Sequence, residues 1–298
     1  TSNVLTGKMF NVPISGTHAH SWVQKFDTEI EAFRAYADIY PDSCLLLIDT
    51  YDVLNSGVKN AITVFNELRA KGHEPLGVRL DSGDLTYLSR EVRRILDEAG
   101  FENVKITASN DLDEYTITSL KQEGAKIDSW GVGTKLITSY DYPSFGGVYK
   151  LAAATNSEGL LVPKIKISEN PEKINNPGFK KVVRIYNENG KAEADLIMLA
   201  DEVIDESNTL EIFDPIYTWK TKKFEKYSLR EVLSPLFKDG KCVRDKKTIQ
   251  EVTEYTRQEL ASLWDQHKRI KNPHIYKVDL SEGLWKMKQD MIASKKVK

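Results

Sequence analysis

The chain has 298 residues, of which 40% are hydrophobic and 29% are charged, with a formal net charge of -2 at pH 7. This length and composition are typical of a soluble globular protein with one or two domains. A net charge this close to zero argues against bulk binding of nucleic acid, which requires a basic surface.

The cysteines and the apolar runs indicate where the protein works. Cys44 and Cys242 lie far apart and form no disulfide framework. No apolar run approaches the length of a membrane-spanning helix, and no signal peptide is visible. We therefore expect a cytoplasmic protein. The chain opens with Thr1-Ser2-Asn3 instead of Met, which suggests a fragment or a processed product of something longer.

Strands and helices are predicted to alternate over the first 140 residues. The expected strands are short apolar runs at 12–15, 44–48, 76–80, 104–108 and 127–130. The expected helices are 29–38, 58–68 after an Asn55-Ser56 cap, one from Leu85, and one after an Asp111–Glu114 capping box. Such units predict a parallel sheet, either a barrel or an open doubly wound sheet. Polar residues or glycine end each strand, which favours a barrel with its site there.

The pattern changes after Tyr140. Runs at 148–155, 160–167 and 181–186 are typical of β segments, and Asn189-Gly190 of a hairpin turn. Apolar residues return to helical spacing over 249–263, and 284–292 is a further candidate helix. The sequence thus predicts an α/β barrel portion at 1–140, a small mainly β unit at 141–227 and a helical tail at 228–298.

The stretch from Gly77 to Asp84 places a fixed cation beside two carboxylates. Arg79, Asp81 and Asp84 follow an apolar strand and precede a helix, at the end of a parallel strand where ligands bind. The plainer interpretation is a helix cap from Ser82 or Asp84 with a surface ion pair.

Two other strand ends carry groups for anions or cations. The turn Gly131-Val132-Gly133-Thr134 can direct backbone N–H groups at a phosphate, although glycine-rich turns end many strands. Asp49 and Asp52 could hold a hydrated magnesium ion or sugar hydroxyls, or else serve as a cap and a solvent-facing acid.

His18 and His20 stand two residues apart, so an extended chain would place both on one side. A zinc pair would need a third ligand, and none is evident. A reactive imidazole near phosphate fits better, because histidine is nucleophilic and titrates near neutrality.

Five motifs in one order resemble nicotinate phosphoribosyltransferase, and the resemblance covers essentially the whole chain. They are Thr1-Ser2-Asn3, Gly16-Thr17-His18-Ala19-His20-Ser21, Asp49-Thr50-Tyr51-Asp52, Arg79-Leu80-Asp81-Ser82-Gly83-Asp84 and Trp130-Gly131-Val132-Gly133-Thr134. The resemblance implies an incomplete parallel α/β barrel of phosphoribosyltransferase type II, usually in a homodimer. It implies transfer of phosphoribose from phosphoribosyl pyrophosphate to nicotinate, coupled to ATP hydrolysis, in NAD salvage.

The resemblance also implies roles for single residues. His20 matches the histidine that ATP phosphorylates. Thr17 and Arg79 match contacts to nicotinate, Arg79 as the counter-ion of its carboxylate. Asp49 matches an acidic residue near the pyrophosphate and Mg²⁺, and Asp81 is expected to line the ribose.

The resemblance also implies roles for residues that follow the expected strands at 104–108 and 127–130. Ser109 and Asn110 match positions that line the ribose. Thr134 with the amides of Gly131 and Gly133 matches the 5′-phosphate cradle. Independently, carboxylates at strand ends can stabilise the cation-like centre formed when a bond at ribose breaks.

One departure keeps a second interpretation open. The family has a large region before the Thr-Ser-Asn motif, with a stacking aromatic residue and an arginine-rich motif, that is not found here. The alternatives are therefore a phosphoribosyltransferase or another phosphosugar barrel enzyme, and a non-catalytic fragment or subunit that needs that region. A dinucleotide-binding domain is disfavoured because no G-x-G-x-x-G follows the first strand.

Overall fold

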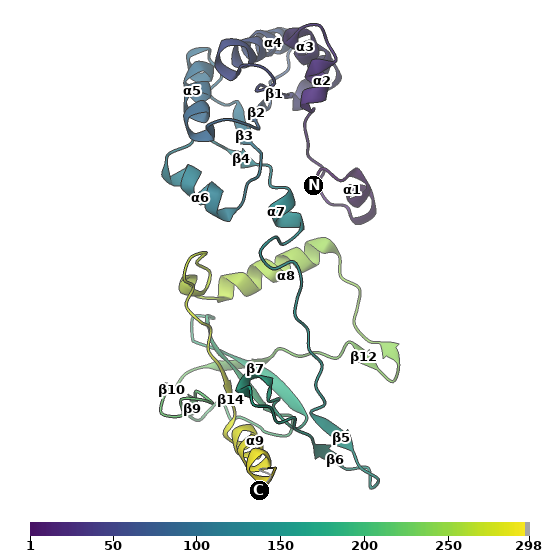
Figure 1. Cartoon of the computed structure of the whole chain (residues 1–298), viewed down its shortest axis with the longest axis vertical. Helices are drawn as coiled ribbons and strands as arrows, with labels where there is room; N and C mark the ends of the chain where they lie inside the picture. Colours follow the sequence, from purple (N-terminus) through teal and green to yellow (C-terminus); the bar gives the residue numbers. More distant parts are fainter. Residues whose placement is uncertain (296–298) are drawn as a thin grey trace. The chain divides into compact units, whose positions relative to one another are not determined.

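The computed structural model describes residues 1–295. The chain divides into two compact units, Thr1–Gly146 and Gly147–Lys298, each of which is described by itself (Figure 1). Within the described residues, no helix combines the length and apolar character needed to cross a bilayer.

The first unit is built on a parallel sheet. Its four strands are β1 (Leu45–Leu47), β2 (Gly77–Leu80), β3 (Lys105–Ala108) and β4 (Ser129–Trp130), in the order β1-β2-β3-β4. The predicted parallel sheet is confirmed. The expected strand at 12–15 is not formed, and closure into a barrel stays a prediction.

Most helices of this unit pack against the apolar core around the strands, whereas the first and the last of them bury no residue (Figure 1). The helices are α1 (Val4–Phe10), α2 (His20–Gln24), α3 (Glu29–Ile39), α4 (Val58–Ala70), α5 (Leu85–Glu98), α6 (Glu114–Gln122) and α7 (Thr134–Ile137), with the short turns η1 (Pro41–Ser43) and η2 (Val53–Gly57). Phe33, Phe65 and Phe101 are fully buried among the apolar strand residues.

Two predicted helix caps are wrong, and for a third helix the structure selects Asp84 over Ser82. The π-helical turn η2 precedes α4 and contains Asn55-Ser56. Its cap is Asp52, which accepts from the Leu54 and Asn55 amides. Asp84 caps α5 by accepting from the Tyr87 amide. Asp113 rather than Asp111 caps α6, because the Asp113 carboxylate accepts from the Thr116 amide at 2.7 Å.

The second unit is built on a mixed sheet in the order β11-β7-β8-β14. Strands β7 (Lys180–Tyr186) and β8 (Ala192–Leu199) form the predicted hairpin, with Gly190 in the left-handed region at φ 70°. Strand β11 (Ser228–Glu231) pairs antiparallel with β7, and β14 (Val278–Leu280) pairs parallel with β8. Ile185, Met198 and Ile212 belong to the core of this unit.

Three hairpins, two helices and two single turns complete the second unit. These are β5 (Ala153–Thr155) with β6 (Leu161–Pro163), β9 (Leu210–Phe213) with β10 (Thr221–Phe224), β12 (Phe237–Lys238) with β13 (Lys241–Cys242), α8 (Ile249–Ser262), α9 (Glu282–Ser294), η3 (Pro171–Lys173) and η4 (Asp265–His267). The prediction separated a β unit at 141–227 from a helical tail at 228–298. The structure joins them, because β11 and β14 of the tail complete the sheet of β7 and β8; residues 296–298 of that tail lie outside the described residues.

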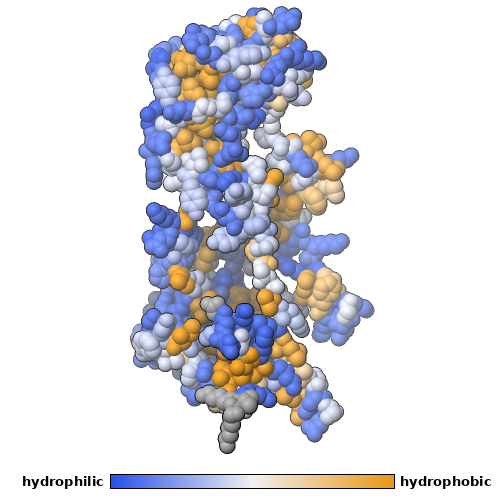
Figure 2. All heavy atoms as spheres, viewed as in Figure 1, coloured by the Kyte–Doolittle hydropathy of each residue, from blue (hydrophilic) through white to orange (hydrophobic). Residues whose placement is uncertain are grey.

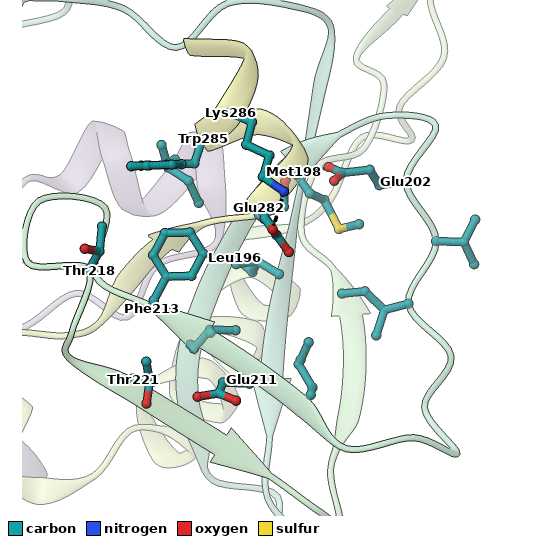
Figure 3. A pocket seen from close by; sticks show the side chains of 16 residues that line it. Leu196, Met198, Glu202, Glu211, Phe213, Thr218, Thr221, Glu282, Trp285 and Lys286 are labelled. Atoms are coloured by element: carbon teal, nitrogen blue, oxygen red, sulfur yellow. Dashed lines mark hydrogen bonds and ion pairs between the residues drawn. The ribbon is translucent and has the colours of Figure 1, made fainter. Parts of the chain in front are cut away.

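A groove of about 640 Å³ opens in the second unit, between the β9–β10 hairpin and α9. Trp285 and Lys286 of α9 and Phe213 of β9 point along its walls (Figure 3). All of its lining residues belong to the second unit, so it shares none with the strand ends of the first.

Both cysteines are free, in opposite environments. Cys44 is buried just before β1, and burial raises the pKa of its thiol to about 12. Cys242 is exposed in β13.

Candidate active site

Polar residues gather at the carboxyl ends of the four parallel strands, as the sequence predicts. Asp49 follows β1, Asp81 follows β2, Ser109 follows β3, and Gly131 follows β4. Because neighbouring parallel strands end at the same edge, one small region receives side chains from segments far apart in the sequence.

Arg79 in β2 contacts three other side chains of this region. Its Nε donates to Ser109 Oγ at 2.7 Å, its Nη1 to Thr17 Oγ1 at 2.8 Å, and its Nη2 to Asp81 Oδ1 at 3.0 Å. The Ser109 hydroxyl in turn donates to Asp81 Oδ1. A guanidinium carries five N–H donors, so these contacts leave donors for an anionic ligand. The network joins β2 and β3 to the loop before α2.

The surroundings of Asp81 favour its charged form. Burial raises the pKa of this carboxyl, but the Ser109 hydrogen bond and the Arg79 charge together outweigh burial, so the pKa lies below its usual value. Asp81 is therefore an anion at neutral pH and can stabilise positive charge that develops beside it.

Asp49 is held rigidly with one oxygen unused. Its Oδ2 accepts from the Asp81 amide at 2.8 Å and from Ser82 Oγ at 2.6 Å. Its side chain is only 1% exposed, and Oδ1 has no hydrogen-bond partner among the described residues. A buried, unpaired carboxylate oxygen is the kind of ligand that Mg²⁺ accepts. No group of three or more His, Cys, Asp or Glu side chains in residues 1–295 could hold a metal ion, so the remaining ligands would be water and substrate oxygens.

His20 faces both carboxylates from the first turn of α2. Its Nε2 lies 3.6 Å from Asp81 Oδ2 and 3.9 Å from Asp49 Oδ1. Its Nδ1 is 3.1 Å from the hydroxyl of Thr50. The side chain is 39% exposed, so a ligand can reach it. One ring nitrogen is thus held by a hydroxyl while the other faces the acidic strand ends.

His18 does not join this cluster. It is 7% exposed, its Nε2 accepts from the Leu47 amide at 3.1 Å, and its Nδ1 lies 3.4 Å from the Ala19 carbonyl. Burial is the main reason why the pKa of His18 falls to about 4. Because both ring nitrogens are engaged, the alternative of a His18–His20 metal pair has no geometric support. Asp52 likewise serves as a cap, with its carboxylate on Leu54 and Asn55.

One backbone amide of the turn after β4 is hydrogen-bonded within the sheet. The Gly131 amide donates to the Ala108 carbonyl at 2.7 Å, so this donor is already used. A Cβ added at Gly131 would lie 3.2 Å from Ser109 Cβ, whereas one at Gly133 would meet nothing within 4 Å. The amides of Gly133 and Thr134 have no partner in the described part of the chain. The open side of the turn is therefore at Gly133 and Thr134.

Asn110 adopts an unusual backbone conformation next to Ser109. Its φ is 116°, and its side-chain oxygen accepts from the Asp111 amide at 2.9 Å. Asparagine tolerates positive φ better than most residues because its side chain can bond to nearby backbone. Strained positions of this kind cluster at functional sites.

Two residues of the cluster are not among the predicted site residues. Thr50 contacts His20, and Ser82 contacts Asp49. Each directly follows an acidic residue at a strand end in the sequence, which is the signal that could have indicated them. Their hydroxyls are placed to orient the side chains of His20 and Asp49.

Two family profiles match the chain. One described as "Nicotinate phosphoribosyltransferase (NAPRTase) family" matches residues 1–191, and one described as "Nicotinate phosphoribosyltransferase C-terminal domain" matches residues 179–288. The chain belongs to the nicotinate phosphoribosyltransferase family. The predicted family is thereby confirmed, and every residue of the strand-end cluster falls within the first match.

Relatives and solved structures agree with this family. The nicotinate phosphoribosyltransferase of Bacillus subtilis (strain 168) is 47% identical over 293 residues, which cover 98% of this chain and 59% of the relative. The human nicotinate phosphoribosyltransferase is 30% identical, with 95% of this chain and 62% of the relative covered. This chain therefore spans about 60% of the length of these relatives.

The fold is also similar to solved structures. The crystal structure of human nicotinic acid phosphoribosyltransferase aligns with a TM-score of 0.80 at 26% identity, over 97% of this chain and 64% of the human one. A nicotinate-nucleotide pyrophosphorylase from Pyrococcus furiosus aligns with a TM-score of 0.60 at 19% identity, over 88% of this chain and 58% of that one, which shows the fold alone.

Proposed function

We propose that this chain carries the strand-end site of a nicotinate phosphoribosyltransferase that works in NAD salvage. The reaction joins nicotinate to phosphoribosyl pyrophosphate, giving nicotinate mononucleotide and pyrophosphate, coupled to ATP hydrolysis. Family membership supports the reaction class, and the geometry that carries the proposal is His20 facing Asp49 and Asp81. A cytoplasmic location and a homodimer stay predictions.

Arg79 and Thr17 are proposed to bind nicotinate. Arg79 keeps unused N–H donors beside its contacts to Thr17, Ser109 and Asp81, and a carboxylate can take two parallel donors from one guanidinium. An uncharged amide in the same place would accept less strongly. This difference supports nicotinate over nicotinamide as the substrate.

The phosphoribosyl group is proposed to lie across β3 and β4. Gly133 and Thr134 offer free amides and a hydroxyl to the 5′-phosphate, and Gly131 keeps the turn close to Ser109. Ser109 and Asn110 then line the ribose with Asp81. In the transfer, the bond from ribose C1 to the pyrophosphate oxygen breaks while a bond from C1 to the nicotinate ring nitrogen forms. The Asp81 carboxylate lowers the energy of the positive charge at C1.

The ATP-linked step is proposed to use His20 as the phosphoryl acceptor. A ring nitrogen forms a bond to the γ-phosphorus as the bond to the bridging oxygen breaks and ADP leaves; water later releases the phosphate from His20. The Thr50 hydroxyl can orient the ring during this step. Mg²⁺ held by Asp49 would neutralise phosphate charge when bound.

The alternative is a chain that needs a further polypeptide to form a working site. Helix α1 has no buried residues, and Val4, Leu5, Met9 and Phe10 are each more than half exposed. Figure 2 shows apolar side chains gathered on this helix. A seven-residue helix with its apolar side uncovered gains little stability alone, so a covering polypeptide is favoured there.

The test follows phosphate from labelled ATP. The wild-type chain should incorporate acid-labile label, and His20→Asn should not. The matched control is His73→Asn, a partly exposed histidine of the same unit that contacts Asp42. Label retained on His20→Asn would overturn the assignment of His20. No label on any variant would favour the alternative, which adding the unmatched segment of the Bacillus subtilis relative as a second chain then tests directly.

A further inference from the structure

The segment before α2 runs beside the end of β1 in a fixed register. His18 contacts Leu47 through a 3.1 Å bond from the Leu47 amide to Nε2. Two residues further along both segments, His20 faces Asp49, and it also reaches Thr50, the next residue. The His18 contact and the His20 contacts thus follow one another along the same two segments.

The partner of His18 is an amide that the sheet leaves unpaired. β1 lies at one end of the strand order, and its ladder bonds go to β2. No strand among the described residues pairs with its other side, where the Leu47 amide points. A buried N–H without an acceptor costs about 1–3 kcal/mol. The imidazole supplies the acceptor that a neighbouring strand would otherwise provide at this position.

The surroundings of His18 hold its ring in one orientation. Its ring centroid lies 4.7 Å from that of Tyr36 and 6.1 Å from that of Phe33, both on α3. Since Nε2 accepts, the proton belongs on Nδ1, which faces the Ala19 carbonyl. The main chain is tied as well, because the Thr17 hydroxyl donates to the His18 carbonyl while it accepts from Arg79.

We propose that His18 is a positioning residue of this site: by accepting the Leu47 amide, it fixes the register of residues 16–20 against β1 and so holds His20 beside Asp49 and Asp81. His18 touches no reacting atom in this scheme. The activity part of the test rests on the proposed function, whereas the structural part does not.

The structural part compares His18→Leu with His18→Gln by NMR. The Gln side-chain oxygen can still accept from Leu47, and Leu cannot. We expect the nuclear Overhauser contact between the His20 ring and the Thr50 methyl group to persist in His18→Gln and to vanish in His18→Leu. A folded His18→Leu that keeps this contact overturns the proposal, as does its equal loss in both variants.

A backbone variant covers the case in which His18→Leu fails to fold. Replacing the Leu47 amide by an ester removes the N–H donor and leaves every side chain in place. The same Overhauser contact should weaken or disappear. An unchanged contact in the ester variant would show that packing of the ring, and not its acceptor nitrogen, sets the register.

The activity part separates positioning from general damage. In folded His18→Leu, labelling of His20 by ATP should fall on the order of tenfold to a hundredfold, as expected for a displaced nucleophile. Affinity for phosphoribosyl pyrophosphate, which depends on Gly133 and Thr134, should stay within about twofold because that turn is untouched. His73→Leu serves as the control with no expected effect. Equal losses in labelling and affinity would overturn the proposal; absent labelling in the wild type would count against the proposed function and leave the Overhauser contact to decide.

Discussion

Arg79 connects three side chains, so replacing it tests both binding and electrostatics. Arg79→Ala should weaken nicotinate binding by about 1.5–3 kcal/mol, the range for a hydrogen bond to a charged group. Nicotinamide, which carries no carboxylate, should lose less, so discrimination between the two should fall. Isothermal calorimetry with both compounds measures this directly.

The matched control is Arg34→Ala. Arg34 makes a comparable paired contact with Glu67 on the surface of the same unit, away from the strand ends. Its replacement should leave both affinities unchanged. If Arg79→Ala weakens phosphoribosyl pyrophosphate as much as nicotinate, Arg79 holds the site together and does not select the acceptor.

The buried His18 should make stability depend on pH. Its pKa falls from 6.5 to about 4, first through burial and then through the charges of Arg79 and His20, while Tyr36 of α3 packs on the ring. Between these values the unfolded chain binds the proton and the folded chain does not. Stability is therefore full above pH 6.5 and is lost as pH falls toward 4, by up to about 3 kcal/mol.

Urea unfolding at several pH values checks this effect. The difference in unfolding free energy between wild type and His18→Gln should shrink as pH falls from 7 to 4.5, because the variant has no imidazole to protonate. A difference independent of pH would mean that His18 titrates normally in the folded protein.

At the scale of single residues, motif spacing indicated the cluster but not the direction of each side chain. Arg79, Asp81, Asp49 and His20 do meet. Spacing could not distinguish His18 from His20, because their separation depends on burial against α3, which is a tertiary contact. Nor could it show that the Gly131 amide is used within the sheet.

Among the elements, the turn η2 depends on a glycine at a close approach. A Cβ at Gly57 would lie 1.9 Å from the Ile48 carbonyl oxygen, which is backbone and cannot move freely. Gly57→Ala should destabilise the fold by about 1–3 kcal/mol or more, as overpacking does. Gly16→Ala, where nothing lies within 4 Å, should be nearly neutral. Thermal unfolding of the two variants tests the pair, and equal stability would contradict the close approach of η2 to Ile48.

In the turn after β4, unlike at Gly57, a side chain added at Gly133 would face open space. Gly133→Val should leave the protein folded and weaken phosphoribosyl pyrophosphate by at least about tenfold, because the side chain would occupy the space in front of two free amides. Gly146→Val, equally unobstructed, is the control. Unchanged affinity by calorimetry in the folded Gly133→Val protein would remove this turn from the site.

Element types were more predictable than their ends. Apolar runs predicted β1 to β4 and helical spacing predicted α3, α4 and α5, since both patterns reflect burial. The predicted caps before α4 and α6 are a few residues from the observed ones, because several residues near each helix start can serve as caps and only Asp52 and Asp113 accept the amides. Short strands such as β11 and β14 carry too few residues to show alternation.

Over the whole molecule, each unit has its own apolar core, one around Phe65 and Phe101 and one around Ile185 and Met198. Separately produced 1–146 and 147–298 should therefore each unfold cooperatively. The binding of phosphoribosyl pyrophosphate should remain with 1–146, which contains all of the proposed contacts. Circular dichroism on heating and calorimetry check both statements; a non-cooperative 1–146 would show that the sheet needs the second unit.

The contrast between the two cysteines makes the chain a substrate for selective labelling. Alkylating reagents react with thiolates, and Cys44 is buried with its pKa near 12, whereas Cys242 is exposed. At neutral pH a maleimide dye should attach once per folded chain, at β13, and twice after unfolding. A fluorophore can thus report on the second unit while the chemistry of the first proceeds unmodified.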